Sequence, residues 1–259
     1  MVAVIASAPV ALRALLAEAP RSLSALSVEH RDGWGLAWVE GDDWQVRKGT
    51  DCAAACSDYR RVALEARSHL AIAHVRQKTV GKTSLANTHP FRRDRWVLAH
   101  NGTVENLAAV TERCSPRRLA EIDGETDSER LFAFLMTVID EHAGDVTEGL
   151  RAAVRELRAI PRVGAVNFLL SDGEHLYALR LGRSLFVLDR TDDPRRRTPS
   201  IAIASERLTD EEWTEVAEGA LLIVPGRTAP RVRVVSSGQR FTRASVDPNT
   251  SITRPRNHM

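Results

Sequence analysis

Short apolar runs near both ends of the chain, with two long amphipathic segments between them, make up its hydrophobic pattern. Apolar runs of this length, bounded by Gly, Pro, Asn or Asp, are typical of β-strands. The expected strands are residues 2–6, 36–39, 44–47, 69–74, 96–99, 165–170, 175–181, 184–188, 200–204, 220–224 and 231–235. Strands followed by helices and then by strands again indicate an α+β domain built from packed layers.

The two amphipathic segments, residues 128–142 and 146–160, have apolar side chains at helical spacing. Thr126 or Asp127 is a natural N-cap for the first of them, because a short polar side chain can accept a hydrogen bond from the opening turn. Shorter helices are expected over residues 9–19 and 53–66.

Composition indicates one soluble globular domain. The chain has 259 residues, 43% hydrophobic content and a net charge of +2, which is enough for one sizeable core and indicates no nucleic-acid partner. No apolar run approaches the length of a membrane span, and Arg13 and Glu18 do not fit a signal peptide. We therefore expect a cytoplasmic protein with a single domain over residues 1–236. The basic tail that follows, 237–259, is either a solvated terminus or a site for an acidic partner.

The three cysteines, Cys52, Cys56 and Cys114, suit a reducing compartment. Cys52 and Cys56 are spaced to share a helix face, but no further ligands follow at metal-binding spacing. We read them as small, partly buried residues, and expect neither a metal nor another cofactor.

The stretch from residue 68 to 106 contains the candidate chemistry. Its first expected strand is followed by Arg76, whose planar guanidinium can hold a carboxylate in two parallel bonds. Its second is followed by Asn101 and Gly102, which together offer two neutral donors of the kind that stabilise an oxyanion. An Asn-Gly pair after a strand is also the ordinary signal of a tight turn, so these letters alone leave both interpretations open.

Further motifs surround this stretch. Before it lies RDGWGLAW, within it are HVRQ, NTHPF and LAHNG, and after it come GETDSE, VNFLLSDG and IASE. In this order the motifs resemble the glutaminase domain of the class II glutamine amidotransferases, a family of N-terminal-nucleophile hydrolases, over roughly residues 2–224. The stand-alone bacterial members are the most similar. The resemblance implies a four-layer αββα sandwich, with two stacked antiparallel sheets between helices.

The resemblance also assigns roles to residues. Asn101 and Gly102 match the oxyanion hole, Arg76 the group that binds the α-carboxylate of glutamine, and Asp127 the group that binds its α-ammonium. Thr79 matches a further substrate contact.

Two other positions matter: His89, which the resemblance places among the substrate-binding residues, and Val2, which stands at the position of the nucleophile. His89 falls in the NTHPF motif, where its role is mainly structural. The nucleophile of the family is a cysteine directly after the initiator methionine, and here that position is Val2.

Val2 has no nucleophilic atom, so two classes of function compete. In the first, the protein binds glutamine or a γ-glutamyl compound without efficient hydrolysis, as a sensor or as a subunit that stabilises a protein partner. In the second, it is an active glutamine or γ-glutamyl amide hydrolase that trims a metabolite or supplies ammonia to a separate synthetase. The second requires an unrecognised nucleophile or a different start of the chain.

Overall fold

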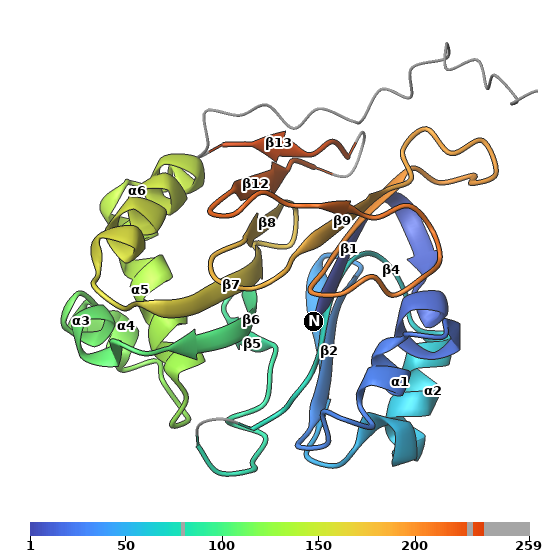
Figure 1. Cartoon of the computed structure of the whole chain (residues 1–259), viewed down its shortest axis with the longest axis horizontal. Helices are drawn as coiled ribbons and strands as arrows, with labels where there is room; N and C mark the ends of the chain where they lie inside the picture. Colours follow the sequence, from blue (N-terminus) through green and yellow to red (C-terminus); the bar gives the residue numbers. More distant parts are fainter. Residues whose placement is uncertain (79–80, 227–229, 236–259) are drawn as a thin grey trace, which may run out of the picture.

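Two antiparallel β-sheets are stacked between two layers of helices (Figure 1). The computed structural model describes residues 1–78, 81–226 and 230–235. Inward-facing side chains of both sheets form a shared apolar core, which includes Ile5 and Ile72 from one sheet and Leu169 and Leu222 from the other. The expected four-layer αββα architecture is therefore confirmed.

Sheet A lies beside the N-terminal helices. Among the described residues its strand order is β11-β9-β10-β1-β4-β2-β3. These strands are β1 (Val2–Ala11), β2 (Trp34–Glu40), β3 (Asp43–Gly49), β4 (Arg67–Val75), β9 (Phe186–Asp189), β10 (Ser200–Ala204) and β11 (Thr214–Glu215). The helical elements that cover its outer face are η1 (Ala14–Glu18), α1 (Leu23–Leu26), η2 (Ala53–Ala55) and α2 (Ser57–Glu65).

Sheet B packs against the two long helices. Its strand order, again for the described residues, is β13-β12-β8-β7-β6-β5. These strands are β5 (Phe91–Arg93), β6 (Trp96–Val104), β7 (Gly164–Ser171), β8 (Leu176–Leu179), β12 (Leu221–Val224) and β13 (Arg233–Val234). The helices on this side are α3 (Leu107–Glu112), α4 (Pro116–Leu119), α5 (Asp127–Glu141) and α6 (Val146–Ala159).

Side-chain alternation along the strands fills three separate cores. In β1, Ala3 and Ile5 face the core between the sheets, whereas Val2 and Val4 face the helices outside sheet A. This period of two is the geometric rule of a pleated strand. A shift of one residue would therefore exchange the two sets of side chains.

Most expected elements are present, and some boundaries agree closely. Helices α5 and α6 occupy the two predicted amphipathic segments, and Thr126 is the N-cap of α5. The predicted pairing of the last two strands is confirmed, with Leu222 opposite Val234. In these helices and strands the apolar pattern is long or regular enough to specify the type of element.

Two expectations are wrong in detail, and one of the two interpretations left open for Asn101 and Gly102 is excluded. Residues 9–19 do not form one helix, because β1 continues to Ala11 by pairing with β4 and only Ala14–Glu18 is helical, as a π-helical turn. Residues 53–66 form two short helices separated at Cys56, whose backbone is extended. Asn101 and Gly102 do not form a turn but lie inside β6, paired with β7.

The remaining expectations concern parts of the chain that the structure does not describe. Thr79 and the basic tail 237–259 both lie outside the described residues. Among the helices that are described, none combines the length and apolar character needed to cross a bilayer.

Candidate active site

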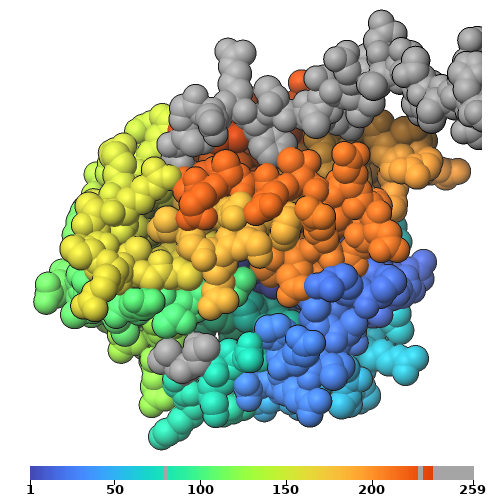
Figure 2. Space-filling view, viewed as in Figure 1, coloured from blue at the N-terminus to red at the C-terminus, as the bar shows by residue number. Residues whose placement is uncertain are grey.

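A cavity of about 130 Å³ lies between the start of β1, the ends of β4 and β10, and the start of α5. Sheet A contributes Met1 and His74 to its lining, and β6 of sheet B contributes Asn101 and Gly102. Segments from the N-terminal, central and C-terminal parts of the chain meet on one face of the molecule (Figure 2). Tertiary structure thus brings together residues that are far apart in the sequence.

Asp127 is held in place by the N-terminus of α5. Thr126 caps the helix by accepting a hydrogen bond from the N–H of Glu129 at 3.3 Å, and its hydroxyl donates to the Glu129 carboxylate at 3.3 Å. The first of these bonds is the usual N-cap interaction, and the second joins the two side chains. Asp127 is 5% exposed, and its Oδ2 accepts a hydrogen bond from the N–H of Val104, at the end of β6, at 2.8 Å. The carboxylate is therefore fixed beside the cavity.

Glu129 ties this helix to the loop before it. Its side chain is 1% exposed, and its Oε1 accepts hydrogen bonds from the N–H groups of Asp123 and Gly124 at 3.1 and 3.2 Å. The guanidinium of Arg93 donates to the same oxygen at 3.0 Å. A buried carboxylate needs this full set of donors, because desolvation without partners would cost several kcal/mol.

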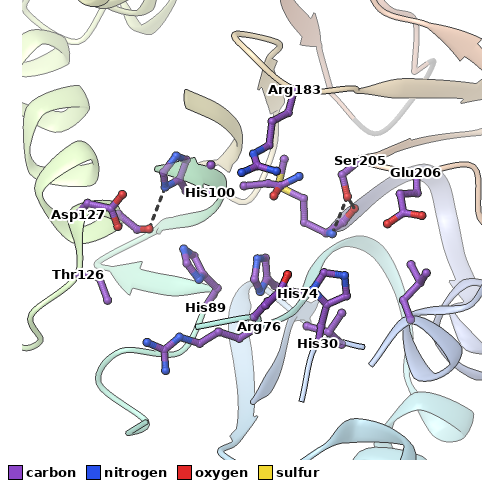
Figure 3. Close-up of a pocket in the computed structure, with 17 residues that line it drawn as sticks. His30, His74, Arg76, His89, His100, Thr126, Asp127, Arg183, Ser205 and Glu206 are labelled. Carbon is purple, nitrogen blue, oxygen red and sulfur yellow. Dashed lines mark hydrogen bonds between the residues drawn. The ribbon is translucent and has the colours of Figure 1, made fainter. Parts of the chain in front are cut away.

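Arg76 follows β4 directly and is 4% exposed. Its backbone is fixed against the RDGWG segment, because its N–H donates to Gly33 O at 2.8 Å and its C=O accepts from Asp32 N at 3.0 Å. Its Nη1 donates to Lys82 O at 3.3 Å. Burial lowers the pKa of the guanidinium, and Asp32 opposes that shift. The side chain remains a cation at the base of the site (Figure 3).

The NTHPF motif joins the other motifs together. The Asn87 amide donates to Lys82 O at 2.9 Å and accepts from Glu125 N at 2.8 Å, so it connects this loop to the GETDSE segment. The carbonyl of His89 lies so close to Gly35 that a Cβ there would be 2.1 Å from its oxygen. The loop can approach β2 this closely only because residue 35 is glycine.

Gly102 has a similar steric role in β6. A Cβ at this position would lie 1.9 Å from the carbonyl oxygen of Ala165 in β7. The preceding residue, Asn101, lies opposite Asn167 in the same strand pair. Both Asn101 and Gly102 line the cavity, as the sequence predicted.

Three histidines line the inner part of the cavity (Figure 3). The rings of His74 and His89 have centroids 4.4 Å apart, and His100 lies 6.5 Å from His89. His100 is hydrogen-bonded to Ser128 Oγ at 2.9 Å and to Ala165 O at 3.2 Å. Neither ring nitrogen of His89 has a partner among the described residues. Burial lowers the pKa values of His74 and His89 well below the usual range, so both rings are neutral at pH 7.

Met1, and not Val2, lies at the cavity. The Met1 amino group donates to Ser205 Oγ at 2.9 Å, and burial lowers the pKa of that amine to about 6, with Glu206 opposing the shift. The side chain of Met1 belongs to the core between the sheets, whereas Val2 packs on the helical side of sheet A. The sequence comparison placed Val2 at the nucleophile position. Strand alternation instead turns its side chain away from the site.

No cysteine lines the cavity in the described part of the chain. Cys114 is buried beneath α5, where burial raises the pKa of its thiol to about 11. Cys52 and Cys56 lie beside α2. Across residues 1–78, 81–226 and 230–235, no group of three His, Cys, Asp or Glu side chains is arranged to hold a metal ion.

Other residues of the site had no assigned role in the sequence. His30, Arg183, Ser205 and Glu206 all line the cavity. Ser205 and Glu206 belong to the IASE motif, which was a usable signal. Arg183 stands in the connection that leads from β8 in sheet B to β9 in sheet A and carries no recognisable motif, so only the fold places it at the site.

Comparison with known proteins identifies the class to which this site belongs. The sequence profile of the class-II glutamine amidotransferases matches residues 19–195. Since the match covers more than half of the chain, the protein belongs to this family. It is 28% identical over 230 residues to the γ-glutamyl-hercynylcysteine sulfoxide hydrolase of Mycobacterium tuberculosis, covering 84% of this chain and 89% of that protein.

Other relatives share only part of their length with this chain. A putative glutamine amidotransferase of Haemophilus influenzae is 30% identical over 170 residues, which are 61% of this chain and 55% of the relative. Among solved structures, a glutamine aminotransferase class-II domain protein from Silicibacter pomeroyi has a TM-score of 0.65 and 25% identity, covering 91% of this chain and 99% of that one. Phosphoribosylpyrophosphate amidotransferase of B. subtilis, at 18% identity and a TM-score of 0.64, covers 91% of this chain and 49% of its own and shares the fold.

Proposed function

We propose that this protein binds glutamine or a γ-glutamyl compound in the cavity and hydrolyses its amide poorly or not at all. The observation that carries the proposal is that Arg76 and Asp127, two buried residues of opposite charge, line the same cavity. An α-amino acid offers a carboxylate to Arg76 and an ammonium to Asp127, so each side chain would contact a ligand group of opposite charge.

The amide end of the ligand would lie at β6. The side-chain amide of Asn101 and the N–H of Gly102 would stabilise a negatively charged oxygen on the γ-carbon. We propose Thr79 as a further contact to the substrate. His89 would act on the ligand mainly by shaping the inner wall, through its ring contacts with His74 and Phe91.

Weak hydrolysis follows from the residues at the start of β1. Met1 is the first residue at the cavity, its side chain is a thioether, and no cysteine among the described residues lines the cavity. A thioether cannot form the glutamyl thioester through which thiolate attack proceeds. Oxyanion stabilisation alone does not replace a missing nucleophile.

A second candidate function rests on Ser205. Its hydroxyl is buried and lies 2.9 Å from the Met1 amine, whose pKa of about 6 makes it a base near neutral pH. That pairing of base and hydroxyl is the arrangement from which a serine nucleophile is activated. In this case the protein would be a γ-glutamyl amide hydrolase with Ser205 as nucleophile.

The experiment combines intact-mass analysis, glutamine binding by calorimetry and glutamate release. Its key variant inserts a cysteine between Met1 and Val2, so that removal of the initiator methionine leaves a cysteine at the place of Met1 without changing the alternation of β1. The matched control inserts alanine. We expect the wild-type chain to bind glutamine without releasing glutamate, and the cysteine insertion alone to gain hydrolysis.

Other outcomes separate the alternatives. Glutamate release by the wild-type chain that disappears in Ser205→Ala would establish the second candidate. Absence of glutamine or γ-glutamyl binding in every variant would refute both. Greater activity of Val2→Cys than of the insertion would show that the register of β1 differs from the one described.

A further inference from the structure

Arg183 is a cation at the cavity that no acidic side chain neutralises. Its guanidinium has no hydrogen bond or ion pair within the described residues, although it lines the cavity. In Figure 3 its side chain extends from the β8–β9 connection toward the space between His100 and Ser205. Arg183 is exposed, so water solvates its guanidinium in the free protein, and an anionic group of a ligand would have to replace that water. An arginine that points into a concave site next to buried groups is suited to binding an anion.

The backbone of Arg183 is held firmly although its side chain is free. Asn167, which is 0% exposed, accepts hydrogen bonds from the N–H groups of Leu181 and Arg183 at 2.8 and 3.2 Å. The amide of Asn167 also donates to the carbonyls of Arg183 and Ser184 at 2.9 and 3.1 Å. One buried side chain therefore fixes the position of the whole connection.

Asn167 also links Arg183 to Asn101 and Gly102, the residues proposed to bind the amide oxygen. Asn167 lies directly opposite Asn101 in the pairing of β6 with β7. Gly182 packs against Ala165, the residue whose carbonyl also meets Gly102. Arg183 is thus anchored behind the two residues that would hold the amide oxygen, and not beside the helix that carries Asp127.

The charged residues that line the cavity leave Arg183 without an anionic partner of its own. Of the two acids that line the cavity, Asp127 is assigned to the ligand ammonium and Glu206 is paired with Arg21. A bound glutamine would neutralise Arg76 and Asp127 and would leave Arg183 without a counter-charge. A ligand with a second anionic group, on the far side of the γ-amide, would supply it.

We infer that Arg183 selects γ-glutamyl amides whose amine portion carries an anionic group, such as the carboxylate of a γ-glutamyl peptide, over glutamine itself. This inference rests on the proposed binding of a glutamyl group in the same cavity. It assigns the amine portion of the ligand to the region under the β8–β9 connection.

The test compares two ligands of similar length by calorimetry on the full chain. γ-Glutamylglycine carries the additional carboxylate, and γ-glutamylethylamide is its neutral counterpart. We expect the wild-type chain to bind γ-glutamylglycine at least about tenfold more tightly, which corresponds to about 1.4 kcal/mol. Arg183→Gln should reduce the ratio of the two affinities to about one, and added salt should reduce it in the wild type.

The matched control is Arg60→Gln. Arg60 is an exposed arginine on α2 that does not line the cavity, so its loss should leave the ratio unchanged. Equal affinity of the wild type for both ligands would overturn the role of Arg183 while leaving the glutamyl site intact. An unchanged ratio in Arg183→Gln would do the same. Failure of both ligands to bind would instead refute the proposed function, and the inference with it.

Discussion

Two regions of the cavity differ in how their charged groups are held. At the start of α5, the Glu129 carboxylate accepts hydrogen bonds from two backbone N–H groups and from Arg93, and Asp127 is bonded to the end of β6. At the β8–β9 connection, Asn167 fixes the backbone, but the guanidinium of Arg183 has no partner in the described structure. The first region is a preorganised site, and the second presents one adjustable group.

The difference separates a region where substitutions are costly, at the start of α5, from a region where ligand preference can change, at the β8–β9 connection. Buried charges need complete sets of partners, so a change at the start of α5 that leaves such partners unpaired would disturb the fold as well as the ligand site. A charge on an anchored loop can be exchanged with little structural consequence. Changes in ligand preference should therefore be obtained more readily at residue 183 than at residue 127.

The largest effect is expected for Glu129→Ala. It leaves Arg93 and two backbone N–H groups without their buried acceptor, and breaking a buried pair in this way costs about 3 to 5 kcal/mol. Urea unfolding measures the loss. Glu65→Ala is the matched control, because Glu65 is exposed and only weakly paired with Arg61. A loss below about 1 kcal/mol at Glu129 would show that the two regions do not differ as described.

The next largest effect is expected for Asp127→Asn. The asparagine oxygen can still accept the hydrogen bond from Val104, so the fold should be retained while the charge that holds the ligand ammonium is lost. We expect glutamine affinity to fall at least about thirtyfold, or about 2 kcal/mol, by calorimetry. Unchanged affinity combined with unchanged stability would exclude Asp127 from the ligand site.

A dependence on pH is expected from the buried histidines. The folded-state pKa values of His74 and His89 lie well below those of the unfolded chain, so only the unfolded chain takes up their protons as the pH falls below about 6.5. Stability should therefore decrease on acidification by up to about 1.4 kcal/mol per pH unit for each ring. The Met1 amine, with a pKa lowered to about 6, adds a change of the same sign between its folded and unfolded values.

Urea unfolding between about pH 5 and pH 8 measures this slope. His89→Leu should reduce it by the contribution of one group, whereas His175→Gln, on a surface hairpin, is the control. A stability that rises on acidification would contradict the assignment of neutral, buried rings to the inner wall.

The smallest effect is expected for replacement of Cys52 and Cys56 by serine. Neither residue lines the cavity, since Cys52 contacts Ser27 after α1 and Cys56 caps the start of α2. Glutamine affinity should be unchanged, and stability should change by about 1 kcal/mol or less. A loss of binding in the double variant would show that the site extends beyond the residues described.

Much of the site could be predicted from local sequence. The motifs identified Arg76, Asn101, Gly102 and Asp127, and the structure brings all four to one cavity. The helix that carries Asp127 was also predictable, because its N-cap, Thr126, and its apolar spacing act within a few residues of each other.

Other features depended on contacts between distant segments. Asn101 and Gly102 have the local signature of a turn, yet pairing with β7 holds them in an extended strand. Residues 9–11 follow β4 instead of entering a helix, because cross-strand hydrogen bonds outweigh a weak helical pattern. Arg183 could not be found from sequence, because its place depends on one buried asparagine in another strand.

The sequence by itself thus determined the family, the layered fold class and several of the residues that line the cavity. Tertiary structure decided which of the first two residues meets the site, because side chains alternate along β1 and only its register with β4 and β10 sets their direction. It also decided that Arg183, which has no ion pair within the described residues, lies near Asn101 and Gly102 at the cavity. Both depend on pairing between strands that are far apart in the chain, which no local pattern specifies.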